Sequence, residues 1–210
     1  MASISRITTE RTAMIVVVGT RNPKKLSEIL EILGDFGLDL RDLSGWPITP
    51  DVVEDGETFE ANARKKATEV ALHLSQWVIG EDSGLVVPAL NGRPGVYSAR
   101  YAGKQGDDEA NNNRLLAELA PLPPEHRAAF YICTAALSDP NGNVIAVVEG
   151  RCHGVIIKER RGSGGFGYDP LFLIPEYHKT FAELSSRVKH ALSHRARALA
   201  QLRPALRKLQ

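Results

Sequence analysis

Residues 14–34 read MIVVVGTRNPKKLSEILEILG, and this stretch decides the fold class. Its first five residues form an unbroken apolar run, which is typical of a strand buried on both faces of a parallel or mixed sheet. A helix is predicted to follow, because Asn22 suits an N-cap and Pro23 suits the first helical position. Apolar residues at helical spacing continue to Gly34, which ends the helix. A strand, a short loop and a helix in this order predict an α/β fold.

Working outward from this unit, apolar periodicity and turn residues predict the other elements. Helices are expected over residues 58–74 and 107–119 and through the C-terminal third, and short strands over 77–79 and 85–87, with longer ones over 128–137 and 144–154. A capping box at Thr180 and Glu183 and a cap at Ser193 mark helix starts, and Pro204 is expected to kink or shorten the last helix. Residues 14–210 are predicted to form a single α/β domain with an elongated mixed β-sheet flanked by helices.

Composition narrows the class of protein. The 210 residues carry 26 Lys and Arg against 25 Asp and Glu, which gives a formal charge of +1. That balance argues against a dedicated nucleic-acid binder, which normally has a basic excess. No run approaches the ~18 apolar residues of a membrane span, and Cys133 and Cys152 are the two cysteines, so we expect a cytoplasmic protein without a membrane partner. Residues 1–13 lack an apolar signal segment and are expected to be a disordered N-terminal extension.

Residues 20–25, TRNPKK, cover the predicted loop and the helix start. Unpaired backbone N–H groups and the positive end of the helix dipole favour phosphate at such a place. The two lysines would add positive charge to it. The sequence is not a Walker A loop, and a capped helix with two solvated lysines is the simpler interpretation of the same residues.

Carboxylates gather in two places. Glu81 and Asp82 are adjacent and follow a predicted strand, where they cost stability unless cations or donors offset their repulsion. Asp82 could bind Mg²⁺ or orient a water molecule, because Mg²⁺ takes few carboxylates together with water and substrate phosphates. A simple turn is the alternative, since Asp, Ser and Gly are turn residues. Glu54, just before the second helix, carries the same ambiguity.

Two further features carry polar or aromatic groups. The loop over 162–169, GSGGFGYD, contains four glycines, which are costly unless positive φ angles or close approach of a ligand require them. Phe166 and Tyr168 on this loop could stack on a flat ring, or the loop could be a mobile surface segment. Lys189 and the pair His194 and Arg195 place three donors near a helix start, although such a pair is more often on the surface.

Each of these features is ambiguous alone, but six motifs that occur in a fixed order along the chain indicate a particular protein family. The chain resembles the noncanonical purine nucleoside triphosphate pyrophosphatases, also called inosine or xanthosine triphosphate pyrophosphatases, over about residues 14–200. The motifs are TRNPKKLSE (20–28), EDGETF (54–59), DSGL (82–85), PGVYSARYAG (94–103), GGFGYDPLF (164–172) and SHR (193–195).

The resemblance implies two lobes around a central nucleotide cleft, and it implies a role for each matching residue. Asp82 would be the catalytic base and, with Glu54, a ligand of Mg²⁺, which is the expected cofactor. The residues implied in substrate binding are Thr20, Arg21, Asn22, Pro23, Lys24, Lys25, Lys66, Ser83, Phe166, Gly167, Tyr168, Asp169, Lys189, His194 and Arg195. The first seven would hold the phosphates, and the others would hold the nucleoside and its purine.

The resemblance also implies the reaction. A small-molecule substrate such as ITP, dITP or XTP would be hydrolysed to the monophosphate and pyrophosphate, which cleanses the nucleotide pool, and the protein would be a homodimer. The chain departs from the family pattern at Val53 and Ala61, where a glutamate is common, so Glu54 and Asp82 are the acids that remain. A nucleotide-binding module without turnover is the alternative, and it would not need both acids.

Selectivity has a donor–acceptor basis. Hypoxanthine and xanthine carry a 6-oxo acceptor, which Arg195 or His194 could satisfy, with Phe166 stacked on the ring. Adenine presents an amino donor at that position, so donors would face donors and stay unpaired, which is costly in a buried site. We therefore expect the C-terminal SHR motif to separate ITP from ATP.

Overall fold

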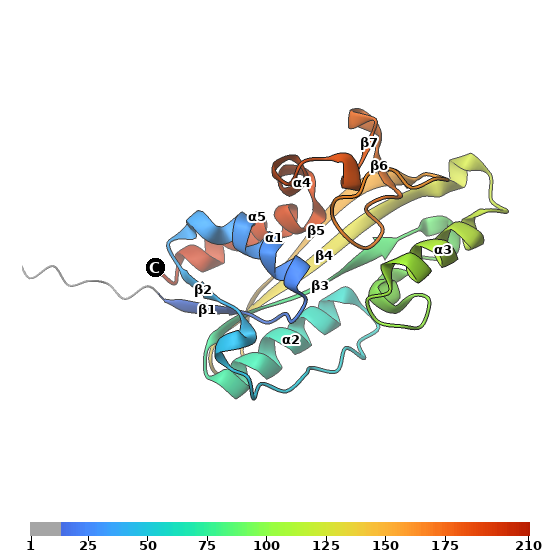
Figure 1. Ribbon diagram of the computed structural model, residues 1–210. Helices are drawn as coiled ribbons and strands as arrows, with labels where there is room; N and C mark the ends of the chain where they lie inside the picture. The colour runs from blue at the N-terminus through green and yellow to red at the C-terminus, as the bar shows by residue number, and fades with distance from the viewer. Residues whose placement is uncertain (1–13) are drawn as a thin grey trace, which may run out of the picture.

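The computed structural model describes residues 14–210, and the expectation for residues 1–13 lies outside them. Seven strands form one sheet, with helices on both of its faces (Figure 1). The strands are β1 (Ile15–Val18), β2 (Asp39–Arg41), β3 (Trp77–Val86), β4 (Ala128–Ser138), β5 (Val144–Ile156), β6 (Phe172–Ile174) and β7 (Lys179–Thr180). The helices of more than one turn are α1 (Pro23–Leu33), α2 (Phe59–Leu74), α3 (Asp108–Leu119), α4 (Ser186–Leu192) and α5 (His194–Arg207).

The sheet has the order β2-β1-β3-β4-β5-β6-β7. The first three strands are parallel, and the remaining pairings are antiparallel. β1 ends at Val18, which lies opposite Ile79 of β3, whereas β3 continues to Val86 along β4. From Gly80 onward, β3 therefore has a free edge where β1 has stopped. Open α/β sheets commonly bind ligands at such a change of neighbours.

Two layers of helices cover the sheet. Val16 and Val18 of β1 point to one face and pack in the same apolar cluster as residues of α1 and α5, whereas Val17 points to the other face and packs with residues of α2. A separate apolar cluster joins the far end of β3 to α3 and to β6. The mixed sheet flanked by helices, with apolar clusters on both of its faces, confirms the predicted fold class.

The opening unit folds as predicted, but the interruption predicted after residue 79 is wrong. β3 is one strand of ten residues, and Glu81 and Asp82 lie in its middle and not in a turn. The glycines around them serve close packing. A Cβ on Gly80 would lie 2.4 Å from the backbone of α2 at Ala63, and a Cβ on Gly84 would lie 2.4 Å from Ser98 Oγ.

The C-terminal third also differs from its prediction. It contains β6 and β7, and the capping box of Thr180 and Glu183 is present but begins a short 3-10 turn, η7 (Phe181–Glu183). α5 starts at the Ser193 cap as expected and continues past Pro204 to Arg207. No helix within residues 14–210 is both long enough and apolar enough to cross a membrane.

Candidate active site

A cavity of about 860 Å³ follows the free edge of β3, and its volume is typical of a small-molecule site. The start of α1, the middle of α2, the loop before β6 and the start of α5 all contribute to its wall. Every residue predicted for the site lines this cavity: Thr20, Arg21, Asn22, Pro23, Lys24, Lys25, Glu54, Lys66, Asp82, Ser83, Phe166, Gly167, Tyr168, Asp169, Lys189, His194 and Arg195.

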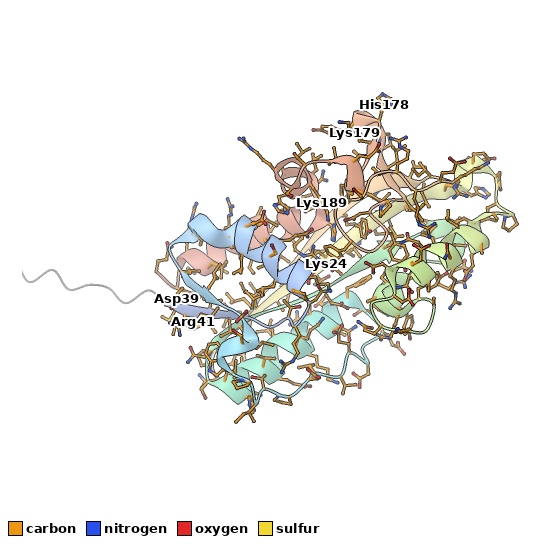
Figure 2. The ribbon with its side chains drawn as sticks, viewed as in Figure 1. Lys24, Asp39, Arg41, His178, Lys179 and Lys189 are labelled. Atoms are coloured by element: carbon orange, nitrogen blue, oxygen red, sulfur yellow. The ribbon has the colours of Figure 1, made fainter. Side chains whose placement is uncertain are left out.

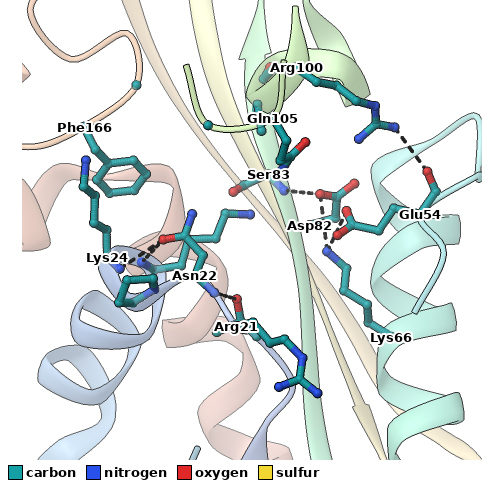
Figure 3. A pocket seen from close by; sticks show the side chains of 18 of the residues that line it. Arg21, Asn22, Lys24, Glu54, Lys66, Asp82, Ser83, Arg100, Gln105 and Phe166 are labelled. Carbon is teal, nitrogen blue, oxygen red and sulfur yellow. Dashed lines mark hydrogen bonds and ion pairs between the residues drawn. The ribbon is translucent and has the colours of Figure 1, made fainter. Parts of the chain in front are cut away.

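The loop between β1 and α1 presents the start of a helix to the cavity (Figure 3). Asn22 Oδ1 accepts hydrogen bonds from the backbone N–H groups of Lys24 (3.0 Å) and Lys25 (3.2 Å), and Thr20 Oγ1 accepts one from Asn22. Lys25 Nζ lies 3.2 Å from Glu81 Oε2. Burial lowers the pKa of Lys25, but nearby carboxylates, Glu81 first, outweigh it and hold the pKa above its usual value. Lys25 is therefore a cation at this helix start.

Glu81 and Asp82 are consecutive on β3, so their side chains point to opposite faces of the sheet. Glu81 points toward α1 and α5, where Lys25 and Arg195 are its partners. Asp82 points toward α2, where Asn62 Nδ2 donates a hydrogen bond of 3.0 Å to it. The repulsion expected between adjacent carboxylates is thus reduced by the alternation of the strand. The cavity, which follows the edge between the two faces, has different chemistry at its two ends.

The α2 end of the cavity holds two carboxylates and one lysine. Lys66 Nζ lies 2.9 Å from Glu54 Oε2 and 3.6 Å from Asp82 Oδ1. Burial raises the pKa of Asp82 above its ordinary value, although Lys66 and Lys25 act in the opposite direction. A carboxylate with a raised pKa accepts a proton more readily, which suits a general base.

This donor set fits Mg²⁺ in one way. Within residues 14–210, no group of three or more His, Cys, Asp or Glu side chains is placed to hold a metal ion. Mg²⁺ needs fewer protein ligands, because it keeps several waters and is commonly bound by one or two carboxylates plus substrate phosphates. Among the described residues, Lys66 is the one cation within ion-pair distance of Asp82 and Glu54, so negative charge remains for a metal cation. The residues present fit Mg²⁺ that arrives together with a phosphate ligand.

The opposite end of the cavity rests on a buried network of ion pairs. Lys189 Nζ lies 2.8 Å from Glu28 Oε1 and 2.6 Å from Asp169 Oδ2. Arg195 binds Glu28 through Nη1 and Glu81 through Nη2, the latter at 3.0 Å. Burial raises the pKa of Glu28, but Arg195 and Lys189 lower it more, so this carboxyl stays ionised. The five side chains connect α1, β3, the loop before β6 and the two C-terminal helices.

The glycine-rich loop has the backbone that its sequence predicts. Gly162, Gly165 and Gly167 have φ angles of 79°, 72° and 61°, which only glycine adopts easily. Asp169 Oδ2 accepts a hydrogen bond from the Phe166 N–H at 2.9 Å and ties the loop to itself. These contacts make it an ordered wall of the cavity and not a free surface loop.

The two aromatic side chains of this loop differ. The buried Tyr168 donates its hydroxyl hydrogen to the Ser98 carbonyl at 2.8 Å, so this ring supports the loop. The Phe166 ring has Lys24 Nζ 5.6 Å and Lys189 Nζ 4.8 Å from its centre. Figure 2 labels these two lysines, which come from distant parts of the chain and meet in the middle of the molecule. The Phe166 ring lines the cavity, and its stacking on a flat ligand stays a prediction.

His194 and Arg195 lie inside the protein, and the interpretation that they form a surface pair is wrong. They are 5% and 1% exposed. His194 stacks on Tyr131 with ring centres 4.8 Å apart, and burial, with Arg195 beside it, lowers its pKa well below the usual value, so the imidazole is neutral. Within residues 14–210, His194 Nδ1 and Arg195 Nε are buried without a hydrogen-bond partner. Buried polar atoms without a partner are rare and need an explanation, and both of these residues line the cavity.

Sequence reasoning missed four residues that shape the cavity. Glu28 belongs to a quoted motif, and a charged residue beside an apolar helical stripe is the signal that could have identified it. Tyr131 lies on β4 behind His194, and Arg100 and Gln105 line the opposite wall (Figure 3). Arg100 belongs to the quoted motif over residues 94–103, whereas nothing local in the sequence distinguishes Tyr131 and Gln105 from other residues.

Known proteins resemble this chain along nearly all of its length. The sequence model of the Ham1 family matches residues 16–205. A protein named dITP/XTP pyrophosphatase from Rhodopirellula baltica is 58% identical over 194 residues, which are 92% of this chain and 93% of that one. Among solved structures, a HAM1 protein from Coxiella burnetii has a TM-score of 0.84 at 36% identity, covering 93% and 99% of the two chains. The nucleoside-triphosphatase and dITP/XTP pyrophosphatase from Mycobacterium abscessus has a TM-score of 0.74 at 46% identity, covering 90% and 98%.

Proposed function

This chain belongs to the Ham1 family, and from that premise we propose that it is a nucleoside triphosphate pyrophosphatase acting on ITP, dITP and XTP. The observation that carries the proposal is one cavity with two different ends. One end has a helix start, lysines and a pair of carboxylates, which suit a triphosphate. The other has an available aromatic ring and two buried unpaired nitrogens, which suit a purine.

The reaction assigned to this site is attack by water on the α-phosphorus. The water oxygen forms a bond to phosphorus while the bond from phosphorus to the oxygen bridging the α- and β-phosphates breaks. The electron pair of that bond leaves with pyrophosphate, and a proton of the water passes to an Asp82 carboxylate oxygen. The raised pKa of Asp82 and its hydrogen bond from Asn62, which fixes its orientation, both support this role.

Charge neutralisation is the second requirement of phosphoryl chemistry, which depends more on positioning and electrostatics than on covalent help. Lys25 and Lys66 supply fixed cations on the two sides of Asp82. Mg²⁺, held by Asp82 and Glu54, would supply further stabilisation of phosphate charge when bound. Asn22 and Thr20 keep the helix start in place between these groups.

Selectivity follows from which donors are still available. Three of the five N–H donors of Arg195 bind Glu28, Glu81 and Ser83, so the Nε donor and one Nη1 donor have no partner among the described residues. His194 is neutral, so its Nδ1 donates or accepts according to its tautomer. A 6-oxo purine matches a donor at this position, whereas the 6-amino group of adenine would leave it unpaired.

The test is a product assay with ITP, dITP, XTP and ATP in the presence of Mg²⁺. We expect the monophosphate and pyrophosphate from the first three and little turnover of ATP. Release of orthophosphate would contradict cleavage between the α- and β-phosphates. Binding of ITP without any product would favour a nucleotide-binding module instead.

The Mg²⁺ requirement, the homodimeric state, a cytoplasmic location and a role in cleansing the nucleotide pool belong to the same proposal. The metal has a direct test. Removal of divalent cations with a chelator should abolish turnover, and Mg²⁺ should restore it. Full activity in excess chelator would refute the metal assignment for Asp82 and Glu54.

A further inference from the structure

One cation at the cavity differs from the others in how its charge is balanced. Within residues 14–210, seven lysine and arginine side chains line the cavity: Arg21, Lys24, Lys25, Lys66, Arg100, Lys189 and Arg195. Six of them have a carboxylate oxygen within ion-pair distance. Among the residues that the structure describes, Arg100 has no such partner. Its positive charge is therefore not compensated by the protein.

Arg100 is nevertheless held in place. It ends a 3-10 turn, η4 (Gly95–Arg100), and its guanidinium carbon lies 5.3 Å from the centre of the Tyr97 ring. Its Nη2 donates a hydrogen bond of 3.2 Å to the backbone carbonyl of Glu54. A guanidinium has five N–H donors, and this is the one hydrogen bond that the Arg100 side chain makes within residues 14–210. Most of its donors are free for a ligand.

The position of Arg100 shows which part of a ligand it would meet. Glu54 holds Arg100 through its carbonyl oxygen and Lys66 through its carboxylate (Figure 3). Arg100 is therefore at the α2 end of the cavity, beside the groups assigned to phosphate and metal. In Figure 3 Phe166, which marks the purine end, lies on the opposite side of the cavity.

We propose that Arg100 binds the β- and γ-phosphates, the part of the substrate that leaves as pyrophosphate. This inference rests on the proposed function. With the purine at Phe166 and the α-phosphate at Asp82, the chain of phosphates continues away from the purine, toward Arg100. The planar guanidinium fork matches phosphate oxygens in pairs. Negative charge on the leaving pyrophosphate increases as the bridging bond breaks. Arg100, whose charge no carboxylate of the described residues balances, would stabilise that negative charge.

A purely structural role makes different predictions. Through the Glu54 carbonyl, Arg100 also connects η4 to the segment before α2, so its loss could loosen this wall. A connecting role alone would lower the melting temperature and weaken all ligands to the same extent. A pyrophosphate-binding role weakens ligands in proportion to the phosphates they carry beyond the α position.

The experiment compares Arg100→Gln and Arg100→Lys with Arg64→Gln, a matched loss of one charge. Arg64 is an exposed residue of α2 that lines no part of the cavity. Calorimetry with Mg²⁺ would give the Kd of pyrophosphate and of IMP for each protein. We expect Arg100→Gln to weaken pyrophosphate binding about tenfold, as for loss of a charged hydrogen bond, with IMP affinity nearly unchanged. Arg100→Lys should recover part of the loss, and Arg64→Gln should match the wild type.

Equal losses for pyrophosphate and IMP, or no loss of pyrophosphate affinity, would overturn the inference. If Arg100→Gln does not fold, Arg100→Lys decides, because a lysine cannot reproduce the paired hydrogen bonds of the guanidinium fork. Failure of the proposed function is distinguishable, since it would appear in the wild type as absent or different products from ITP. The pyrophosphate binding assay needs no turnover and tests Arg100 in either case.

Discussion

The two ends of the cavity balance their charges in opposite ways. At the purine end, Glu28, Glu81, Asp169, Lys189 and Arg195 are all nearly fully buried and paired with one another. At the phosphate end, Arg21 has a side chain about half exposed, and Arg100 has no carboxylate partner among the described residues. The first arrangement fixes the shape of a binding wall, whereas the second keeps positive charge accessible to a ligand. One end of the cavity therefore defines its shape, and the other end supplies its accessible positive charge.

The largest expected effect is at the phosphate end, where Asp82→Asn should remove catalysis and leave the fold intact. Asparagine keeps the shape of the side chain but loses the charge and the basicity, and general bases contribute about 10²–10⁴-fold to rates. The melting temperature should stay the same or rise, because burial disfavours the charged form of Asp82. Measurement of kcat with ITP and of Tm tests this, with the exposed Glu69→Gln on the same helix as Lys66 as the control. Retention of more than a tenth of kcat, under ~1.4 kcal/mol of barrier, would refute the role of Asp82.

Replacement at the purine end should affect stability as well as selectivity. Arg195→Ala leaves Glu28 and Glu81 buried without their shared partner, which typically costs about 3–5 kcal/mol. It also removes the Nε donor, so the ratio of kcat/KM for ITP over ATP should fall by about ten- to a hundredfold, as for a charged hydrogen bond. Denaturant unfolding and the two kinetic ratios measure these effects separately.

Arg203→Ala is the matched control, because Arg203 is an exposed residue of the same helix. A destabilised Arg195→Ala protein with an unchanged ratio would restrict Arg195 to structural support. If Arg195→Ala changes the ratio of kcat/KM for ITP over ATP without lowering the free energy of unfolding, the buried ion pairs do not determine the shape of the purine end.

The smallest expected effect is at the boundary between the two ends, where Lys25 pairs with Glu81 but lies at the helix start. Lys25→Ala should weaken binding of a nonhydrolysable ITP analogue by about tenfold more than binding of IMP, because its contribution depends on phosphate charge. Stability should change little, since Glu81 keeps Arg195 as a partner. Calorimetry on Lys25→Ala and on Lys65→Ala, a partly exposed lysine of α2 that does not line the cavity, would measure the difference. Equal losses for both ligands would assign Lys25 to the buried network instead.

Local sequence patterns predicted the elements that depend on local physics. The cap at Asn22 and the apolar stripe after it define α1, and segments rich in β-branched and aromatic residues predicted β4 and β5. β2 was missed because its three residues, Asp39 to Arg41, carry no apolar pattern. The interruption predicted in β3 was wrong because Gly80 and Gly84 resemble turn residues in sequence, whereas in the fold they let α2 and η4 approach the strand. Sequence cannot distinguish these two uses of glycine.

The site, like the fold, contains residues that local sequence identifies and residues whose partners only the folded chain brings together. Local chemistry made residues 20–25, Asp82 and the glycine loop candidates, the family resemblance assigned them to one site, and the structure brings them to one cavity. The partners of Arg195 were not predictable, because Glu28 and Glu81 are far from it in sequence and only the folded sheet brings the three together. Arg100 was missed for a related reason. It lies in the quoted motif over residues 94–103, but its lack of a carboxylate partner among the described residues is visible only in the structure, which shows how the other cations of the cavity are paired.

The alternation of Glu81 and Asp82 also limits how this protein can change over evolution. Each faces its own layer of helices because β3 keeps its register with β4 from Val78 onward. Insertion or deletion of one residue between Trp77 and Glu81 would exchange the faces of every later side chain on the strand. Asp82 would then point at Arg195, and its neighbour at Lys66, so both ends of the cavity would fail together. Gains and losses of residues are therefore expected to be confined to turns such as residues 139–142, while the spacing within β3 stays fixed.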